Sequence, residues 1–249
     1  MSTQSIRFKI RRQDSPESKP YWQEFELPYK PHSNIISCLQ DIQRQPVTRQ
    51  GKTVTPIVWD CNCLEEVCGS CTMLINGRVR QACTALVDNL TQPVELRPMS
   101  KFPVVRDLQV DRARMFENLK KVQAWVRIDG TYDIGEGPSF PEKQRAKAYV
   151  LSECMTCGCC LEACPQFSKD NKFLGASTFS QVRLFNMHPT GAHDKEERLE
   201  AVMGEGGIAD CGNAQVCVEV CPKNIPLTES IAEIGLQTSW QILKDLLLK

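Results

Sequence analysis

Apolar and polar residues alternate at the start of the chain, and this pattern predicts β-strands. Ile6, Phe8 and Ile10 are separated by polar residues, so they line one face of a strand over residues 5–11. Between residues 35 and 44 the apolar residues recur at helical spacing, and Ser33 or Asn34 can cap this helix. We expect strands over residues 5–11, 21–27, 54–59, 72–75, 78–80 and 94–97 and a helix over residues 35–44. A hairpin followed by a helix and further strands indicates a β-grasp domain over residues 1–105.

The rest of the chain has mainly helical patterns. We expect helices over residues 107–125, 158–164, 177–185, 195–203, 213–221 and 225–248. Ser139 and Glu142 have the spacing of a capping box for one more helix, which leads to Cys154 and follows a glycine-rich loop over residues 129–137. Charged residues in the last helix favour a core helix over a membrane anchor, and the charged run over residues 194–200 is expected to be a solvated helix face. These patterns predict an α+β fold with a mainly helical domain over residues 106–249.

Composition and charge exclude several classes of protein. The chain has 30 Lys and Arg against 30 Asp and Glu, so no excess of basic residues indicates binding to nucleic acid or to an anionic membrane. We find no run of about 18 uncharged apolar residues that would span a bilayer and no secretory signal pattern. The unusual feature is the 14 cysteines. In a cytosolic chain, which keeps its thiols reduced, so many cysteines favour metal ligation over disulfides.

Two cysteine runs in the second half of the chain give the most specific chemical signal. The first has the spacing C-x2-C-x2-C-x3-C-P of bacterial ferredoxins, in which the fourth cysteine binds a second cluster; its residues are Cys154, Cys157, Cys160, Cys164 and Pro165. The second run fits the same template except that Ala214 replaces one cysteine; its residues are Cys211, Cys217, Cys221 and Pro222. We therefore predict a 4Fe–4S cluster held by Cys154, Cys157, Cys160 and Cys221. The second cluster lacks one thiolate, so we predict a 3Fe–4S cluster held by Cys164, Cys211 and Cys217.

An earlier loop has the plant-type pattern C-x4-C-x2-C followed by a later cysteine. The four residues are Cys63, Cys68, Cys71 and Cys83, and we predict that they hold a 2Fe–2S cluster. Gly69 lets the backbone approach the cluster closely. Asn76-Gly77 is a strong hairpin signal, and the hairpin returns Cys83 to the loop. Cys61 could compete with Cys63, but only Cys63 gives the x4 spacing. The first domain is therefore expected to be a plant-type ferredoxin domain and the second a bacterial-ferredoxin-like domain.

Eleven of the 14 cysteines thus have cluster roles, and three remain. Cys38 is expected to be a buried apolar side chain of the first helix, and Cys159 is expected to lie near a cluster as a free thiol. The sequence has no phosphate-binding glycine loop and no acid–base constellation, so we expect no catalytic residue and no substrate site of its own. Three clusters in one chain predict an electron relay that needs a donor and an acceptor as partners.

These cysteine patterns, in this order, resemble those of the iron–sulfur subunits of succinate dehydrogenase and fumarate reductase. Residues 62–75 and 181–198 are especially similar to the menaquinone-linked type of some Gram-positive bacteria. The resemblance implies a flavoprotein subunit with covalent FAD and a membrane-anchor subunit with haem b. Electrons would pass from FAD through the 2Fe–2S, 4Fe–4S and 3Fe–4S clusters to quinone, expected to be menaquinone. The anchor would hold the subunit at the cytoplasmic face of the cell membrane.

Two departures from the ubiquinone-reducing relatives concern the quinone. Residues 166–169 stand where those relatives have a tryptophan that helps form the quinone pocket, and Gly212 stands where the family has a histidine. We therefore expect that the anchor subunit mainly handles the quinone. The cysteines do not set the direction of the reaction, so a fumarate reductase is an alternative, as is a soluble iron–sulfur adaptor of another flavin dehydrogenase. A zinc-binding structural protein is a third alternative, although zinc sites do not need two cross-paired cysteine runs.

Overall fold

The computed structural model describes residues 4–127 and 139–248 and has two compact units. The first comprises Met1–Arg112 together with Cys157–Glu162, and the second comprises Ala113–Thr156 together with Ala163–Lys249. The first contains a sheet and the second is helical, which confirms the α+β class. The domain boundary at residues 105 and 106 stays a prediction. The expected glycine-rich loop over residues 129–137 lies outside the described residues.

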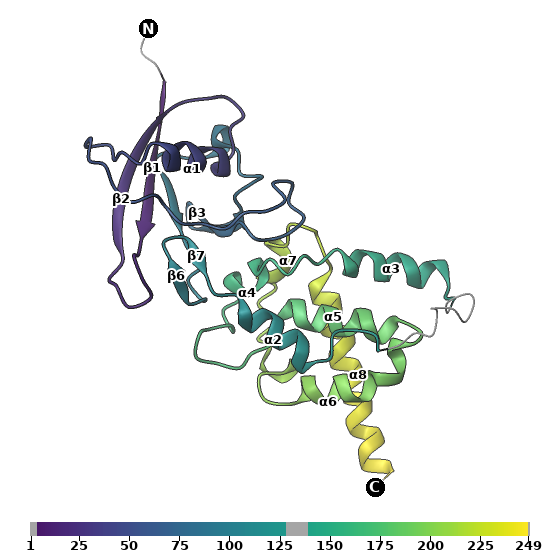
Figure 1. Ribbon diagram of the computed structural model, residues 1–249. Helices are drawn as coiled ribbons and strands as arrows, with labels where there is room; N and C mark the ends of the chain where they lie inside the picture. Colours follow the sequence, from purple (N-terminus) through teal and green to yellow (C-terminus); the bar gives the residue numbers. More distant parts are fainter. Residues whose placement is uncertain (1–3, 128–138, 249) are drawn as a thin grey trace. The chain divides into compact units, whose positions relative to one another are not determined.

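The first unit is built on a five-stranded sheet with the strand order β2-β1-β5-β3-β4 (Figure 1). Strand β1 pairs antiparallel with β2 and parallel with β5, while β3 lies antiparallel between β5 and β4. The strands are β1 (Ser5–Arg12), β2 (Tyr21–Pro28), β3 (Thr72–Ile75), β4 (Arg78–Gln81) and β5 (Val94–Arg97). Five of the six expected strands are therefore confirmed to within one residue. Asn76 and Gly77 connect β3 to β4 with φ angles of 49° and 78°, as the hairpin signal predicts.

Helix α1 (Ile35–Arg44) begins and ends at the expected residues. Asn34 is its N-cap, because the Asn34 side chain accepts a hydrogen bond from the backbone N–H of Ser37 at 2.8 Å. Ile35, Leu39 and Ile42 on its inner face are at most 1% exposed and join the core of the sheet. Cys38 is also buried in this core, as expected, and burial raises its pKa to about 11.

The expected strand over residues 54–59 is wrong, because charged side chains bind the backbone of this segment. Arg12 and Asp107 form a fully buried ion pair with an Nε–Oδ1 distance of 2.8 Å. The Arg12 guanidinium also donates to the carbonyl oxygens of Thr55 and Pro56. Asp107 Oδ2 accepts from the N–H of Val58 at 2.9 Å. The segment is therefore extended but does not pair as a strand of the sheet.

The expected helix over residues 107–125 is confirmed only over Ala113–Lys121. Residues Val104–Arg106 (β6) and Gln109–Val110 (β7) form a small hairpin instead, with Asp107 in the left-handed region at φ 49°. Aspartate tolerates this conformation better than most residues. Helix α2 then runs over Ala113–Lys121. The buried carboxylate of Asp107 accepts hydrogen bonds from Arg12, Gln13 and Val58, which are distant in sequence. These contacts override the local helical pattern.

The second unit is an assembly of helices in which α8 packs against α5 and α6 (Figure 1). Besides α2, its α-helices within residues 139–248 are α3 (Glu142–Ser152), α5 (Ala176–Met187), α6 (Lys195–Met203), α7 (Val216–Glu219) and α8 (Leu227–Leu247). The shorter cluster helix α4 (Cys159–Ala163) belongs to the first unit except for its last residue. The expected capping box is wrong, since Pro141 is the N-cap of α3 and no side chain caps the helix. Glu142 instead pairs with Arg145 on the exposed surface. Helices α4 and α7 are shorter than expected, so the cluster cysteines lie mostly in loops around them.

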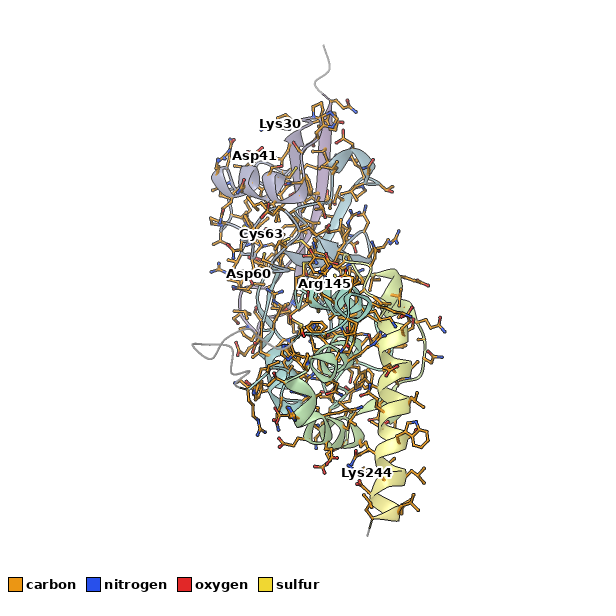
Figure 2. The ribbon with its side chains drawn as sticks, turned by 90° about the vertical axis from the view of Figure 1, so that its right-hand side faces the viewer. Lys30, Asp41, Asp60, Cys63, Arg145 and Lys244 are labelled. Carbon is orange, nitrogen blue, oxygen red and sulfur yellow. The ribbon has the colours of Figure 1, made fainter. Side chains whose placement is uncertain are left out.

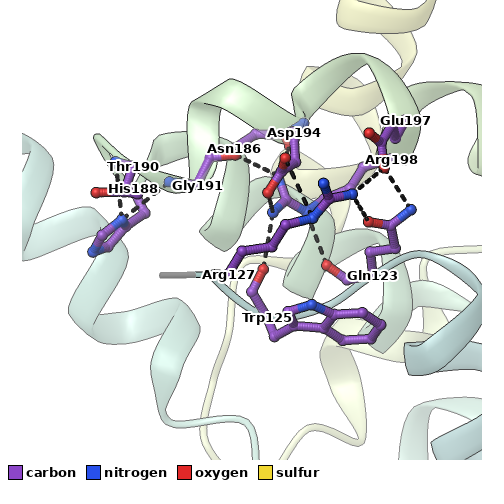
Figure 3. Close-up of polar contacts among 10 residues, drawn as sticks. All are labelled: Gln123, Trp125, Arg127, Asn186, His188, Thr190, Gly191, Asp194, Glu197 and Arg198. Carbon is purple, nitrogen blue, oxygen red and sulfur yellow. Dashed lines mark hydrogen bonds and ion pairs between the residues drawn. The ribbon is translucent and has the colours of Figure 1, made fainter. Parts of the chain in front are cut away.

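Arg198 corrects the expectation that residues 194–200 form a solvated face. Its side chain is completely buried and donates to three backbone carbonyl oxygens, those of Gln123, Trp125 and Gly191, at 2.6–2.9 Å (Figure 3). It also donates to Asn186 Oδ1 at 3.2 Å. The three backbone acceptors lie before and after α5, and Asn186 lies in α5. One buried guanidinium therefore stabilises the packing of several parts of the helical unit. The charges around it, including Glu197, remain partly exposed.

Large apolar side chains lie exposed along the C-terminal half of α8 (Figure 2). Trp240 is 63% exposed and Leu246 is 74% exposed, whereas Ile234 nearer the start is fully buried. Lys244, in the same half, forms an ion pair with Glu196 of α6. None of the described helices is long and apolar enough to cross a membrane. Helix α8 therefore changes along its length from a core helix to a helix with an uncovered apolar surface.

Candidate metal centres

None of the fourteen cysteines, all of which lie in the described residues, forms a disulfide, and the predicted ligands divide between the two units. The first unit contains Cys63, Cys68, Cys71, Cys83, Cys157 and Cys160. The second unit contains Cys154, Cys164, Cys211, Cys217 and Cys221. The predicted 2Fe–2S ligands thus all belong to the first unit and the predicted 3Fe–4S ligands all belong to the second. The predicted 4Fe–4S ligands come from both units, and their grouping stays a prediction from the spacing.

The loop with Cys63 and Cys68 is folded so that backbone N–H groups point at sulfur. Cys63 Sγ accepts from the N–H groups of Val67 and Cys68, both at 3.3 Å. Cys68 Sγ accepts from the N–H groups of Cys63 and Ser70, both at 3.5 Å. Three residues in left-handed conformations, Leu64, Glu66 and Gly69, make the tight turns that allow this arrangement. Figure 2 shows Cys63 in this loop, close to Asp60. Such N–H donors stabilise thiolates, which are the form of cysteine that binds iron.

Two thiols of this group have shifted pKa values. Burial disfavours the Cys68 thiolate, but hydrogen bonds from Cys63 and Ser70 outweigh burial and lower its pKa to about 6. Burial raises the pKa of Cys71 to about 12, and the neighbouring Cys83 side chain adds to the shift through a hydrogen bond and charge repulsion. The two sulfurs of Cys71 and Cys83 are therefore in contact at the buried side of the loop. A cationic metal centre would relieve this repulsion, so the donor set fits a polynuclear iron centre.

Arg112 holds the glycine of this loop in place. Its guanidinium donates to the carbonyl oxygen of Gly69 at 2.6 Å. The hydroxyl of Thr72 donates to the same carbonyl oxygen at 2.8 Å. No signal in the sequence pointed to Arg112, because it lies more than forty residues from the loop. The carbonyl oxygen of Gly69 thus accepts hydrogen bonds from two side chains, which fix the position of this part of the loop.

Cys61 and Cys63 have different surroundings, which bears on the choice between them. Cys61 packs against the apolar core of the first unit, and its pKa is raised, chiefly by burial. Cys63 receives the N–H donors described above. Of the two, Cys63 is the one whose sulfur is shown to accept backbone N–H groups, and its assignment as the ligand stays a prediction from the spacing.

We expect Cys63→Ser to disturb the visible and EPR spectra of the 2Fe–2S centre far more than Cys61→Ser. Serine at residue 63 replaces a soft thiolate ligand by an alkoxide, whereas serine at residue 61 only changes a packing contact. The measurement is the EPR spectrum of the dithionite-reduced variants at equal iron content. A larger change in Cys61→Ser would move the first ligand by two residues.

The cysteines predicted to hold the 3Fe–4S cluster line one pocket in the second unit. Cys164, Cys211 and Cys217 form part of its wall, and Ala214 lies on the same wall. Burial raises the pKa of Cys217, and the neighbouring Cys164 and Cys211 raise it further. Three thiols and one methyl group thus face the position where the bacterial template would have four thiols. This donor set fits a cluster that lacks one corner.

Gln166 and Gly212 also line this pocket. A Cβ atom at residue 212 would collide with the side-chain amide of Gln166. Glycine therefore leaves room for this amide beside Cys211. A larger residue at 212 would require Gln166 to move away from the pocket.

Cys157, Cys159 and Cys160 are all buried in the first unit. A hydrogen bond with the side chain of Cys159 raises the pKa of Cys157 well above its ordinary value, and burial adds to the shift. Cys159 is 1% exposed and accepts a hydrogen bond from Gln81 Nε2 at 3.4 Å. Cys159 thus lies beside a predicted ligand, as the sequence indicated. Gln81 was not identified from the sequence.

Among residues 4–127 and 139–248, no three His, Cys, Asp or Glu side chains converge closely enough to hold a single metal ion. The thiol groups described above lie on the walls of their sites rather than around one point. A cluster that contains several iron atoms and sulfides spans a wider set of thiols than one ion does.

Comparison with known proteins finds one family that matches the first part of the chain and another that matches the second part. Residues 7–117 match the family described as "2Fe-2S iron-sulfur cluster binding domain", and residues 150–225 match the family described as "4Fe-4S dicluster domain". The chain is 61% identical over 241 residues to the succinate dehydrogenase iron-sulfur subunit of Bacillus subtilis, covering 97% of this chain and 95% of that protein. It is 31% identical to the fumarate reductase iron-sulfur subunit of Wolinella succinogenes, covering 88% and 90%. A chain of the Mycobacterium smegmatis Sdh1 complex has the same fold, with a TM-score of 0.78 at 21% identity over 96% of this chain and 97% of that one.

Proposed function

The chain belongs to the family of succinate dehydrogenase and fumarate reductase iron–sulfur subunits, and from this premise we propose how its own residues serve electron transfer. Its role is that of the electron-transfer subunit of a succinate:quinone oxidoreductase. We assign Cys63, Cys68, Cys71 and Cys83 to a 2Fe–2S cluster and Cys154, Cys157, Cys160 and Cys221 to a 4Fe–4S cluster. We assign Cys164, Cys211 and Cys217 to a 3Fe–4S cluster. When bound, these groups each take up and release one electron at a time.

The residues of the chain determine how easily each site accepts an electron. Backbone N–H groups directed at Cys63 and Cys68 favour the more negative, reduced state of the first site. Burial of Cys71 and Cys217 keeps water away and disfavours added charge. The protein thus sets the potentials through hydrogen bonds, burial and ligand number. No residue of this chain is assigned a role in proton transfer or in substrate binding.

The observation that carries the proposal is the pocket lined by Cys164, Cys211, Cys217 and Ala214. A structural zinc site would have a fourth ligand, whereas an alanine at this position supports a cluster with an open corner. A soluble adaptor with two complete clusters would also need a fourth thiol here. The pocket therefore favours a three-cluster relay over both alternatives.

The proposed partners are a flavoprotein subunit as electron donor and a membrane-anchor subunit as acceptor. We propose that the donor carries FAD and that the anchor carries haem b and binds quinone, in this case menaquinone. The complex would lie on the cytoplasmic face of the cell membrane. Electrons would pass from FAD through the 2Fe–2S, 4Fe–4S and 3Fe–4S sites to the quinone. The similarity to a succinate dehydrogenase subunit, at 61% identity, is greater than to a fumarate reductase subunit, at 31%, so we propose succinate oxidation as the direction.

We further propose that the anchor subunit supplies most of the quinone site. The amide of Gln166 lies where a side chain at residue 212 would be. A histidine cannot occupy residue 212 without moving this amide. The surface beside Cys211 therefore differs from that of the relatives that have a histidine there.

The test of the proposed function is EPR spectroscopy of the purified complex, oxidised and reduced, with iron and acid-labile sulfide analysis. We expect a 3Fe–4S signal in the oxidised complex and 2Fe–2S and 4Fe–4S signals after reduction. Reduction by succinate should produce the 2Fe–2S signal without dithionite. Two centres or fewer in intact material, or zinc in place of iron, would contradict the proposal.

A further inference from the structure

Gln81 is an amide side chain at a position where the pattern of its strand calls for an apolar one. In β4 the exposed Arg78 and Arg80 alternate with the buried Val79 and Gln81. Gln81 is 1% exposed. Burying an amide costs free energy unless its polar atoms find hydrogen-bond partners. The residue is therefore expected to have specific partners, and the structure shows them.

Both polar atoms of the Gln81 amide have partners, and each reaches a different cysteine. Oε1 accepts from Cys71 Sγ at 3.7 Å, and Nε2 donates to Cys159 Sγ at 3.4 Å. The amide is held in place by Thr72, since Nε2 also donates to Thr72 Oγ1 at 3.0 Å. Thr72 in turn donates to the carbonyl oxygen of Gly69. The amide thus connects the loop that carries the proposed 2Fe–2S ligands to Cys159.

The connection continues from Cys159 to a proposed ligand of the next cluster. Cys159 follows Cys157 by two residues and directly precedes Cys160, and both neighbours are proposed ligands of that cluster. Cys71, Gln81, Cys159 and Cys157 are each at most 9% exposed and all belong to the first unit. Buried hydrogen bonds therefore run from the proposed 2Fe–2S ligand Cys71 through Gln81 to Cys159, which is next in sequence to the proposed 4Fe–4S ligand Cys160.

We propose that Gln81 is a positioning residue that donates a hydrogen bond to Cys71 when this cysteine is an iron ligand, and so raises the reduction potential of the 2Fe–2S centre. This inference rests on the proposed assignment of Cys71. As an iron ligand Cys71 is a thiolate and has no proton to donate. A half-turn of the amide exchanges Oε1 and Nε2, so that Nε2 donates to Cys71. Cys159, which as a thiol can donate or accept, then donates to Oε1, and Thr72 Oγ1 lies within hydrogen-bond distance of both amide atoms.

The direction of the effect follows from charge. Addition of one electron makes the centre and its ligand sulfurs more negative, so an N–H donor stabilises the reduced state more than the oxidised state. Low dielectric surroundings strengthen this hydrogen bond because water does not compete for the sulfur. The amide can therefore make the centre easier to reduce without taking part in any bond change.

The test is a redox titration of the purified complex, followed by the EPR signal of the reduced 2Fe–2S centre, for wild type and Gln81→Met. Methionine has a similar length and no N–H donor. We expect the equilibrium constant for reduction to fall about tenfold, which corresponds to a midpoint potential about 59 mV lower for a one-electron centre. Arg80→Gln is the matched control, because Arg80 is the neighbouring residue in β4 and is exposed. The potential of the control should equal that of wild type.

A wild-type potential in a Gln81→Met complex with full iron content would overturn the inference. If Gln81→Met does not retain the centre, Gln81→Leu carries the same test, because leucine has no donor and adds no charge. Loss of the 2Fe–2S centre from both variants while the other centres remain would also overturn it, since the amide would then serve folding alone. Absence of a 2Fe–2S signal from the wild-type complex would instead contradict the proposed function itself.

Discussion

The oxidised complex of an Ala214→Cys variant is expected to lose nearly all of its 3Fe–4S EPR signal. Ala214 lies on the wall of the pocket that Cys164, Cys211 and Cys217 also line. In the bacterial template this is the place of the missing cysteine. A fourth thiolate there would retain the iron that a three-thiolate site loses. The extra negative charge would also lower the reduction potential of the centre.

The measurement is EPR of the oxidised and reduced variant, with iron analysis of the same samples. Ala214→Val is the matched control, because valine is close in size to cysteine and has no atom that can bind iron. The control should keep the 3Fe–4S signal. An unchanged signal in Ala214→Cys, at full occupancy of the site, would mean that the two cysteine runs are aligned wrongly.

The second large effect is expected from the buried ion pair of Arg12 and Asp107. Both side chains are 0% exposed. Arg12→Met leaves the carboxylate of Asp107 buried without its charge partner, although the N–H groups of Gln13 and Val58 still donate to it. Removal of one partner of a buried pair costs about 3–5 kcal/mol. We expect the first unit to be destabilised by this amount, seen as a lower urea midpoint for loss of the 2Fe–2S visible circular dichroism.

Arg44→Met is the matched control for this prediction. Arg44 also forms an ion pair, with Asp41 at 2.8 Å, but its side chain is 74% exposed. Exposed pairs contribute about 0–1 kcal/mol, so the control should unfold close to the wild-type midpoint. Equal midpoints for Arg12→Met and Arg44→Met would show that the buried pair does not hold the first unit together.

The sequence was sufficient for elements whose pattern is local. The alternation of Ile6, Phe8 and Ile10 and the helical spacing of residues 35–44 identified their elements within one residue, because the buried face of each element is determined by its own residues. The Asn76-Gly77 turn was predicted for the same reason. The grouping of the cysteines was predicted from spacing, which follows from the short reach of loops around a cluster.

Long-range partners account for what the sequence did not predict. The strand expected over residues 54–59 fails because Arg12 and Asp107, far away in sequence, bind its backbone. Arg198 stands in a run of charges, yet its acceptors Gln123 and Trp125 lie more than seventy residues away and draw it into the core. The role of Gln81 could not be identified from the sequence, because its partner Cys159 is 78 positions further along the chain. In each case a polar side chain is buried, and its hydrogen-bond partners come together only in the folded chain.

The end of α8 has a consequence for biosynthesis. The side chains of Leu246, Leu247 and Leu248 are 74–75% exposed. Adjoining exposed apolar surface of this kind promotes aggregation. A cell that produces this subunit in excess over its complex would accumulate unassembled copies that aggregate. The exposed leucines therefore require that the subunits of the complex be produced in balanced amounts and at the same time.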